Sequence, residues 1–224
     1  KLTHWKEDVP IPTKVMTSRQ VFWLGAGAFI IIVPIGIYFL IVSGWMLLPL
    51  LVVAAICIFA YTPLILKTKS PEWAAGLGLG VLPILGTYFV QTSQYTIPAL
   101  IASVPSGFLV YNLLFLNEFP DIEADKTGGR KTLPITEGQR KASKVFSVTT
   151  ITVYVWITAA VALGQMPAFS LIALLTFPFA VKAIAGAQKS EDLSKLVPAM
   201  GNNVMVVLLT QLLMGVGYIL DKVI

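Results

Sequence analysis

Seven apolar segments, each about 20 residues long, follow one another along this chain of 224 residues, with short polar connections between them. A helix of roughly 20 apolar residues crosses the hydrocarbon core of a bilayer. Charged residues make up 12% of the sequence, whereas soluble domains carry about 25%. The sequence therefore predicts an all-α fold, a polytopic bundle of transmembrane helices in contact with the lipid bilayer. The seven expected spans are residues 21–42, 47–66, 73–91, 97–117, 144–163, 167–187 and 202–221.

Basic residues gather on alternate connections. Every Lys and Arg except Lys222 lies in segments 1–20, 67–72, 118–143 and 188–201 or at the helix ends beside them. Because connections rich in Lys and Arg remain in the cytoplasm, we expect these segments to be cytoplasmic. The basic residues are spread over several short loops, so the net charge of +5 indicates topology, and we expect no nucleic-acid partner.

One connection is unusually rich in charge. It reads "NEFPDIEADKTGGRKTLP" (residues 117–134) and directly follows an apolar run. Asn117, Asp121 and Asp125 are spaced by four, so on a helix they would share one face; we expect Pro120 to kink or restart that helix. Mg²⁺ typically takes one or two protein carboxylates and leaves its other positions to water and substrate phosphate. The spacing is thus suited to a magnesium site.

A basic, glycine-containing run comes immediately after these acids. Gly128 and Gly129 allow the backbone to approach a ligand closely, and Arg130 and Lys131 supply donors for phosphate oxygens. An acidic face followed by such a run is what a magnesium–diphosphate site requires. The alternative is a solvated loop of mixed charge, because D-x-x-x-D alone is a weak signal.

The whole string is more specific. It closely resembles the second aspartate-rich motif of the UbiA superfamily of intramembrane prenyltransferases, and most of all the 1,4-dihydroxy-2-naphthoate prenyltransferase branch. The upstream stretch "FAYTPLILKTKSPEWAAGLGLGVLPILGTYFVQT" is similar to the same branch. The resemblance covers residues 11–140 well and the last three helices only in general pattern.

The resemblance implies specific roles for residues of this motif. Asp121 and Asp125 would bind Mg²⁺ that holds a polyprenyl diphosphate, and Asn117 would assist at the same face. The residues expected to contact the diphosphate are Lys67, Arg130 and Lys131.

Two tyrosines match family tyrosines in or near the cavity, and we expect them to be catalytic. An allylic cation is stabilised over an aromatic face, which would give Tyr61 and Tyr88 a role in the reaction. The alternative is that both belong to the aromatic belt at the membrane interface.

The resemblance predicts a prenyltransferase. It would transfer a polyprenyl group to an aromatic acceptor, 1,4-dihydroxy-2-naphthoate, in menaquinone or related quinone synthesis. Other acceptors remain open: a chlorophyll precursor, a homogentisate-like ring or a glycerol phosphate lipid. From another class, an inactive truncated membrane protein or a transporter remains open. Against a transporter, no charged residue lies in mid-span except Lys182, near a helix end, whereas charges inside the membrane would mark an ion path. We expect a multi-pass protein of the prokaryotic plasma membrane with its active site facing the cytoplasm.

The chain also departs from the family pattern. The family has nine spans and a first aspartate-rich motif, N-D-x-x-D-x-x-x-D, which is not found here; Glu7 and Asp8 lack its spacing, and His4 has no partner at metal-ligand spacing. We expect the chain to correspond to the third to ninth family helices, with half of the metal site missing. The expected organisation is a single domain over residues 1–224, with a cytoplasmic segment at 1–20 and a cytoplasmic catalytic loop at 118–143.

Overall fold

The computed structural model describes residues 17–224, and the predictions made for His4, Glu7 and Asp8 lie outside this range. The described residues form helices and no strands, which confirms the all-α prediction. They fall into two parts: the first ends at Met46, and the second begins at Leu47. The expectation of a single domain stays a prediction.

The first part is one long helix, α2 (Ser18–Ser43). It begins with a capping box: Gln20 N–H donates to Thr17 Oγ1 at 3.3 Å, and Thr17 N–H donates to Gln20 Oε1 at 2.7 Å. It ends at Gly44, whose φ of +91° few other residues adopt. Its 26 residues amply exceed the roughly 20 that a span needs.

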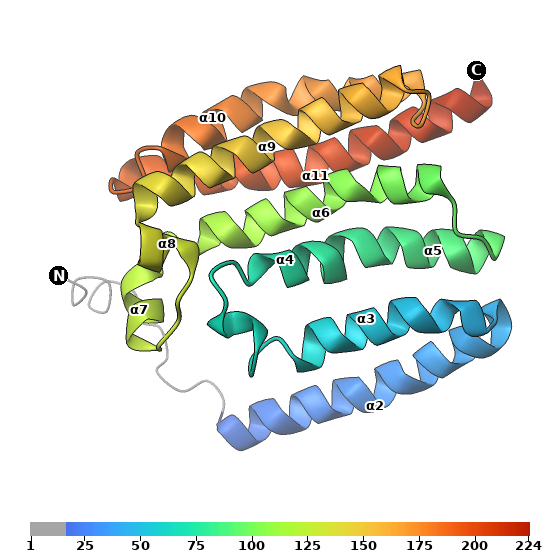
Figure 1. Ribbon diagram of the computed structural model, residues 1–224, viewed down its shortest axis with the longest axis horizontal. Coiled ribbons are helices and arrows are strands. Elements are labelled where there is room, and N and C mark those ends of the chain that lie inside the picture. Colours follow the sequence, from blue (N-terminus) through green and yellow to red (C-terminus); the bar gives the residue numbers. More distant parts are fainter. Residues whose placement is uncertain (1–16) are drawn as a thin grey trace. The chain divides into compact units, whose positions relative to one another are not determined.

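A short 3₁₀ turn, η1 (Trp45–Leu47), links the two parts along the chain. The second part contains the remaining elements (Figure 1). These are α3 (Leu48–Phe59), η2 (Ile65–Lys67), α4 (Glu72–Ala75), the π-helix η3 (Gly76–Val81), α5 (Leu82–Thr92), α6 (Ile97–Asn117), α7 (Ile122–Thr127), α8 (Leu133–Glu137), α9 (Gln139–Ala162), η4 (Ala168–Thr176), α10 (Phe177–Ala187) and α11 (Leu193–Val223).

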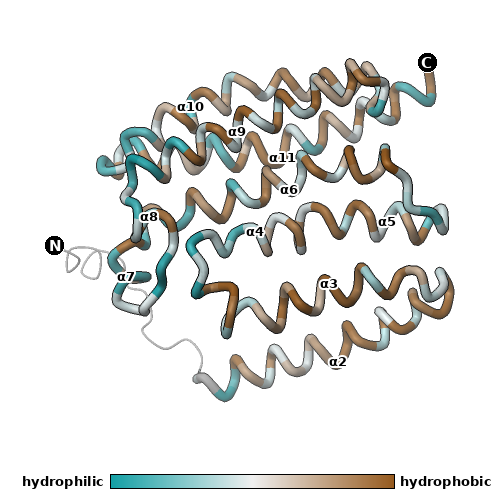
Figure 2. Tube along the Cα trace, in the orientation of Figure 1, coloured by the Kyte–Doolittle hydropathy of each residue, from teal (hydrophilic) through white to brown (hydrophobic). Residues whose placement is uncertain are grey.

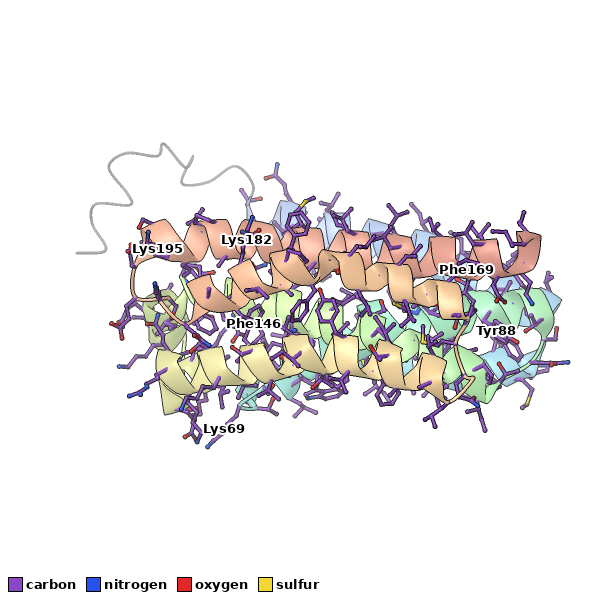
Figure 3. The ribbon with its side chains drawn as sticks, turned by 90° about the horizontal axis from the view of Figure 1, so that it is seen from above. Lys69, Tyr88, Phe146, Phe169, Lys182 and Lys195 are labelled. Carbon is purple, nitrogen blue, oxygen red and sulfur yellow. The ribbon has the colours of Figure 1, made fainter. Side chains whose placement is uncertain are left out.

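The helices of the second part run side by side, so that their connections gather at two ends (Figure 1). The α3–α4, α6–α9 and α10–α11 connections lie at one end, and the α5–α6 and α9–α10 connections lie at the other. Hydrophobic residues predominate along the helices, and hydrophilic residues are concentrated at their ends (Figure 2). Lys69, Lys182 and Lys195 lie toward the first end, which we call the basic end, and Tyr88 and Phe169 lie toward the other (Figure 3). The alternation of basic and neutral connections thus corresponds to two ends of the bundle.

Among residues 17–224, six helical stretches are long and apolar enough to cross a membrane: Arg19–Ser43, Glu72–Thr92, Ile97–Asn117, Gln139–Ala162, Ala168–Ala187 and Leu193–Val223. Their number and length identify an integral, multi-pass membrane protein. The remaining predicted span, 47–66, is shorter than expected, because its apolar helix covers only Trp45–Phe59. The chain turns after Phe59, where Pro63 has no N–H to donate and disfavours helical backbone at Thr62.

The span Glu72–Thr92 contains a turn of π-helix, η3, where the backbone widens. Leu82 N–H donates to Leu77 O, five residues back instead of four, and Pro83 has no N–H to donate. Glycines in this turn allow close packing on α6: a Cβ at Gly80 would lie only 2.7 Å from Gly107 Cα. The glycine-rich sequence therefore brings the two backbones into direct contact.

Polar side chains inside the bundle bond to one another. Asn112 donates to Thr150 Oγ1 at 3.1 Å, Thr149 donates to Asn112 Oδ1, and Asn203 donates to the Asn112 carbonyl at 3.2 Å. The hydroxyl groups of Tyr154 and Thr176 are also hydrogen-bonded to each other, at 2.9 Å. Such bonds satisfy polar groups that the surrounding hydrocarbon would leave unpaired, and they join α6, α9, η4 and α11 in the core.

Candidate active site

The aspartate-rich segment lies at the basic end, between α6 and α8. Helix α6 ends at Asn117, and α7 begins at Ile122, so the break expected at Pro120 is present. Asp121 is the residue that precedes α7, and its carbonyl accepts a hydrogen bond from Asp125 N–H at 2.8 Å. The two aspartates are therefore one helical turn apart on one short helix, and Asn117 stands on the helix before it.

The basic run folds back onto α7. Arg130 Nη1 forms an ion pair with Asp125 Oδ2 at 3.0 Å, and Arg130 N–H donates to the Asp125 carbonyl at 3.0 Å. Gly129, with φ of +78°, allows this reversal. The Asp125 side chain is 15% exposed and the Arg130 side chain 40% exposed. This turn brings the candidate metal ligand and the candidate diphosphate contact together.

The other predicted polar residues of the loop are exposed: Asn117, Asp121, Lys131 and Lys67, the last of which ends η2 on the neighbouring connection. Within residues 17–224, no three side chains of His, Cys, Asp or Glu are close enough to hold a metal by themselves. Asp121 and Asp125 still fit Mg²⁺, since that ion accepts one or two carboxylates and completes its shell with water and phosphate.

The two predicted tyrosines lie at opposite ends. Tyr61 follows α3 at the basic end and lines a cavity of about 370 Å³ with apolar neighbours that include Cys57, Leu79 and Leu114. Tyr88 lies on α5 beside Thr87 and Gln91, toward the other end of the bundle (Figure 3). The structure thus brings Tyr61, but not Tyr88, to the end that carries the aspartates.

A buried pair of carboxyl groups lies beneath the loop. Glu72 begins α4 and is fully buried, and Glu118 follows α6 with 6% of its surface exposed. Burial, a hydrogen bond with Glu72 and the Glu72 charge raise the pKa of the Glu118 carboxyl to about 9, against a smaller opposing effect of Thr132. Burial beside a second carboxyl group therefore favours the protonated form of Glu118.

Tyr61 is a neighbour of this pair. Burial raises the pKa of its hydroxyl first, and the negative charges of Glu118 and Glu72 raise it further, while Arg130 lowers it. Tyr61 therefore lies between the apolar cavity, the carboxyl pair and the basic run.

The sequence interpretation treated Glu118 as a loop charge and gave Glu72 no role. A signal for Glu118 is present in the helical spacing: Tyr111, Phe115 and Glu118 recur at i, i+4 and i+7, on the inward face of α6. Glu72 stands at the start of a long apolar run, where burying a carboxyl group costs free energy unless its oxygens have hydrogen-bond partners. Only the packing of α4 against α6 joins the two.

A second contact fixes the connection that carries Lys67. Glu137, at the end of α8, accepts from Lys69 Nζ through Oε1 and from Lys141 Nζ through Oε2, both at 2.8 Å. Lys69 belongs to the α3–α4 connection and Lys141 to α9. The carboxylate therefore ties that connection to the start of α9.

The contacts with the two lysines predict a low pKa for the Glu137 carboxyl group. Hydrogen bonds from Lys141 and Lys69, together with their charges, lower the pKa of Glu137 from 4.5 to about 2. Because the folded-state pKa is depressed, the contact contributes fully above the ordinary pKa and is lost as the pH falls toward 2. We expect a ¹³C NMR titration of the Glu137 carboxyl to show a midpoint near 2, and the double variant Lys69→Ala/Lys141→Ala to return it toward 4.5. A midpoint near 4.5 in the unmodified protein would contradict the contact.

Comparison with known proteins places the chain in a family. The sequence profile of the UbiA prenyltransferase family matches residues 3–207. The chain is 28% identical over 188 residues to the 1,4-dihydroxy-2-naphthoate octaprenyltransferase of Bacillus subtilis strain 168, covering 83% of this chain and 60% of that protein. It is 26% identical over 142 residues to the protein of the same name from Haemophilus influenzae, covering 63% and 46%.

A third relative is the 2-carboxy-1,4-naphthoquinone phytyltransferase of Synechocystis sp. PCC 6803. It is 25% identical over 160 residues, which cover 67% of this chain and 50% of that protein. The chain thus spans 46% to 60% of the length of these relatives. No solved structure matches the chain. Since the family profile extends over nearly the whole sequence, the chain belongs to the UbiA prenyltransferase family.

Proposed function

We propose that this chain transfers a polyprenyl group from an allylic diphosphate to an aromatic, hydroxylated acceptor, 1,4-dihydroxy-2-naphthoate or a close analogue. The observation that carries the proposal is the position of the aspartate loop: Asp125 and Arg130 meet at the end of the bundle where Tyr61 lines an apolar cavity. The names of three relatives, all of which refer to a naphthoate or naphthoquinone, support the choice of acceptor.

The polar loop would bind the diphosphate. Asp121 and Asp125, with Asn117, would hold Mg²⁺, which when bound would neutralise charge on the leaving diphosphate. Arg130 forms a single-point contact with Asp125, so its remaining N–H groups are available for phosphate oxygens. Lys131 and Lys67, both exposed at the same end, would add two further donors.

The apolar cavity would take the other part of the substrate. Its walls offer little to water, so an allylic cation formed there is protected from hydrolysis. The ring of Tyr61 would stabilise this cation through its negative face. Diphosphate in the loop and isoprenoid chain in the cavity would place the breaking C–O bond between them.

The distribution of basic residues supports one orientation of the protein in the membrane. Lys69, Lys182 and Lys195 lie toward the basic end (Figure 3), so by the positive-inside rule this end, with the proposed site, faces the cytoplasm. A prokaryotic plasma membrane is the expected location, in agreement with the bacterial relatives.

The test is a transfer assay with the protein in lipid nanodiscs. It is incubated with polyprenyl diphosphates of several lengths and with 1,4-dihydroxy-2-naphthoate, in the presence of Mg²⁺ or of excess EDTA, and products are detected by mass spectrometry. We expect a prenylated naphthol only with Mg²⁺ and both substrates; homogentisate and 4-hydroxybenzoate serve as competing acceptors. Absence of any prenylated product from a folded sample, with every acceptor, would refute the proposal.

A further inference from the structure

A second apolar cavity lies between α4–η3 and α6, on the opposite face of α4–η3 from the cavity that Tyr61 lines. Its volume is about 220 Å³, and its lining side chains are Trp73, Leu77, Val81, Val104, Phe108 and Tyr111. The last three recur on α6 at i, i+4 and i+7, so the cavity follows that helix for about 10 Å. It is therefore a slot along the helices, suited to part of an extended chain.

The walls of this cavity offer almost no hydrogen bonds. Tyr111 has the only hydroxyl among the lining side chains, and that hydroxyl is already bonded to Ser70 Oγ at 2.9 Å. Trp73 stands at the basic end of the cavity, in the first turn of α4, and is 45% exposed. Because both walls belong to membrane-spanning stretches, the open side of the cavity meets lipid. An alkyl chain fits such walls, since it packs on them through dispersion contacts alone.

Helix α9 borders the open side of the cavity. Trp156 of α9 donates its ring N–H to the Ile101 carbonyl of α6 at 2.9 Å, and Ile101 stands two turns before Phe108 on the same side of α6. Phe108 itself packs against the hydrophobic cluster to which Val153 of α9 belongs. The cavity therefore opens into a groove that has α6 as its floor and α4–η3 and α9 as its sides.

Two lysines flank the basic end of this groove. Lys69 precedes α4, and Lys141 lies in the first turn of α9; their Nζ atoms each bond to one carboxylate oxygen of Glu137, at 2.8 Å. The lysine side chains are 65% and 62% exposed, and each ammonium group keeps two further N–H donors. Figure 3 shows Lys69 on the side of the bundle along which α9 runs. With Glu137 included, the three side chains bring one net positive charge to the mouth of an apolar groove.

We propose that this groove binds an anionic glycerophospholipid, with one acyl chain in the cavity beside Trp73 and Phe108 and its phosphate on Lys69 and Lys141. Lysine side chains reach from apolar surface to the headgroups, and basic pockets between membrane helices bind anionic headgroups on the cytoplasmic side. The orientation proposed above turns this end to the cytoplasmic leaflet, where anionic lipids are concentrated. The inference concerns lipid binding and is independent of the proposed transfer reaction.

Charge favours this occupant over the others that an apolar groove could take. A neutral lipid would leave the net positive charge at Lys69 and Lys141 without a partner. A second copy of the chain, docked symmetrically, would bring the same two lysines against themselves, and like charges repel.

The test is quenching of Trp73 fluorescence by brominated lipids, because a bromine atom on an acyl chain quenches a tryptophan that it touches. The full chain is placed in phosphatidylcholine nanodiscs that contain an increasing fraction of brominated phosphatidylglycerol or of brominated phosphatidylcholine. The Trp73 signal is the difference between the unmodified protein and Trp73→Phe. We expect the anionic lipid to quench half of this signal at about a fivefold lower fraction than the neutral lipid, the preference that one net charge gives near a membrane surface.

The lysines are tested by Lys69→Gln/Lys141→Gln, which removes both charges and keeps amide donors for Glu137. This variant should lose the preference, so that the two lipids quench equally. The matched control is Lys182→Gln/Lys195→Gln, which removes two charges at the same end but away from Lys69 (Figure 3), and it should retain the preference. Equal quenching by the two lipids in the unmodified protein, or a preference that survives in Lys69→Gln/Lys141→Gln, would overturn the inference.

The cavity is tested by Val104→Phe, which places a ring in the space that the acyl chain would occupy. The lysines are unchanged in this variant, yet brominated phosphatidylglycerol should quench Trp73 less. Quenching as strong as in the unmodified protein would overturn the position of the chain. If neither brominated lipid quenches Trp73 in the unmodified protein, protein and not lipid covers the groove, and the inference is wrong.

Discussion

Asp121→Asn is expected to reduce prenyl transfer at saturating Mg²⁺ by about 100-fold or more, the loss seen when a charge that stabilises a transition state is removed. Asp125→Asn should have a similar effect. Both carboxylates belong to the loop that we propose holds the diphosphate, and an amide oxygen attracts a hard cation much less than a carboxylate does. The measurement is kcat/KM for the prenyl diphosphate as a function of Mg²⁺ concentration, with the variants in nanodiscs.

The two variants differ in what they do to the fold. Asp125 pairs with Arg130, so its replacement also loosens the loop. The Asp121 side chain makes no hydrogen bond to the helix that it precedes, so Asp121→Asn should leave thermal unfolding unchanged. Glu123→Gln, an exposed acid on the same short helix, is the matched control and should change activity less than about twofold. If Asp121→Asn is as active as Glu123→Gln, the assignment of the metal site is wrong.

Gly80→Ala is expected to cause a large loss of stability, because three backbone atoms of α6 surround the position of the added methyl group. The new Cβ would lie 2.7 Å from both Gly107 Cα and the Ser106 carbonyl oxygen, and 2.8 Å from Gly107 N. These are all backbone atoms, so the two helices must separate, and such overpacking typically costs about 1–3 kcal/mol. Thermal unfolding in a mild detergent should show a clearly lowered midpoint.

Two other glycines calibrate this result. A Cβ at Gly107 would meet the end of the Val81 side chain, which can move, so Gly107→Ala should cost less. Gly86 has no atom within 4 Å of its Cβ position, and Gly86→Ala should leave the midpoint unchanged or raise it, because Ala favours helix. A midpoint for Gly80→Ala equal to that for Gly86→Ala would show that the close packing of η3 on α6 does not hold.

Hydropathy predicted the helices well where the helix and the apolar segment have the same ends. For α6 the expected span 97–117 and the helix Ile97–Asn117 agree, because Thr96 accepts from Ala99 N–H at the start and Pro120 follows the end. Helix α9 begins at Gln139 instead of 144, since its first turns are polar and continue beyond the apolar segment. Apolar length predicts where a helix can cross a bilayer, and capping groups decide where it ends.

The candidate site could be predicted only in its local part. Asp121, Asp125 and Arg130 lie within one short segment, and their grouping was expected from spacing. Glu72 stands at the start of α4, and Glu118 follows the end of α6, so their pairing depends on how α4 packs against α6. No local pattern contains that packing, so the pairing of Glu118 with Glu72 could not be predicted, although the helical spacing places Glu118 on the inward face of α6.

The short helical stretch Trp45–Phe59 makes the protein sensitive to bilayer thickness. At 1.5 Å per residue its 15 residues extend about 22 Å, whereas a typical hydrocarbon core measures about 30 Å. This hydrophobic mismatch is relieved either when the bilayer thins around α3 or when the connection after Phe59 is drawn below the headgroups. Because that connection carries Tyr61 and Lys67, the acyl-chain length of the surrounding lipid sets the depth at which these two side chains lie.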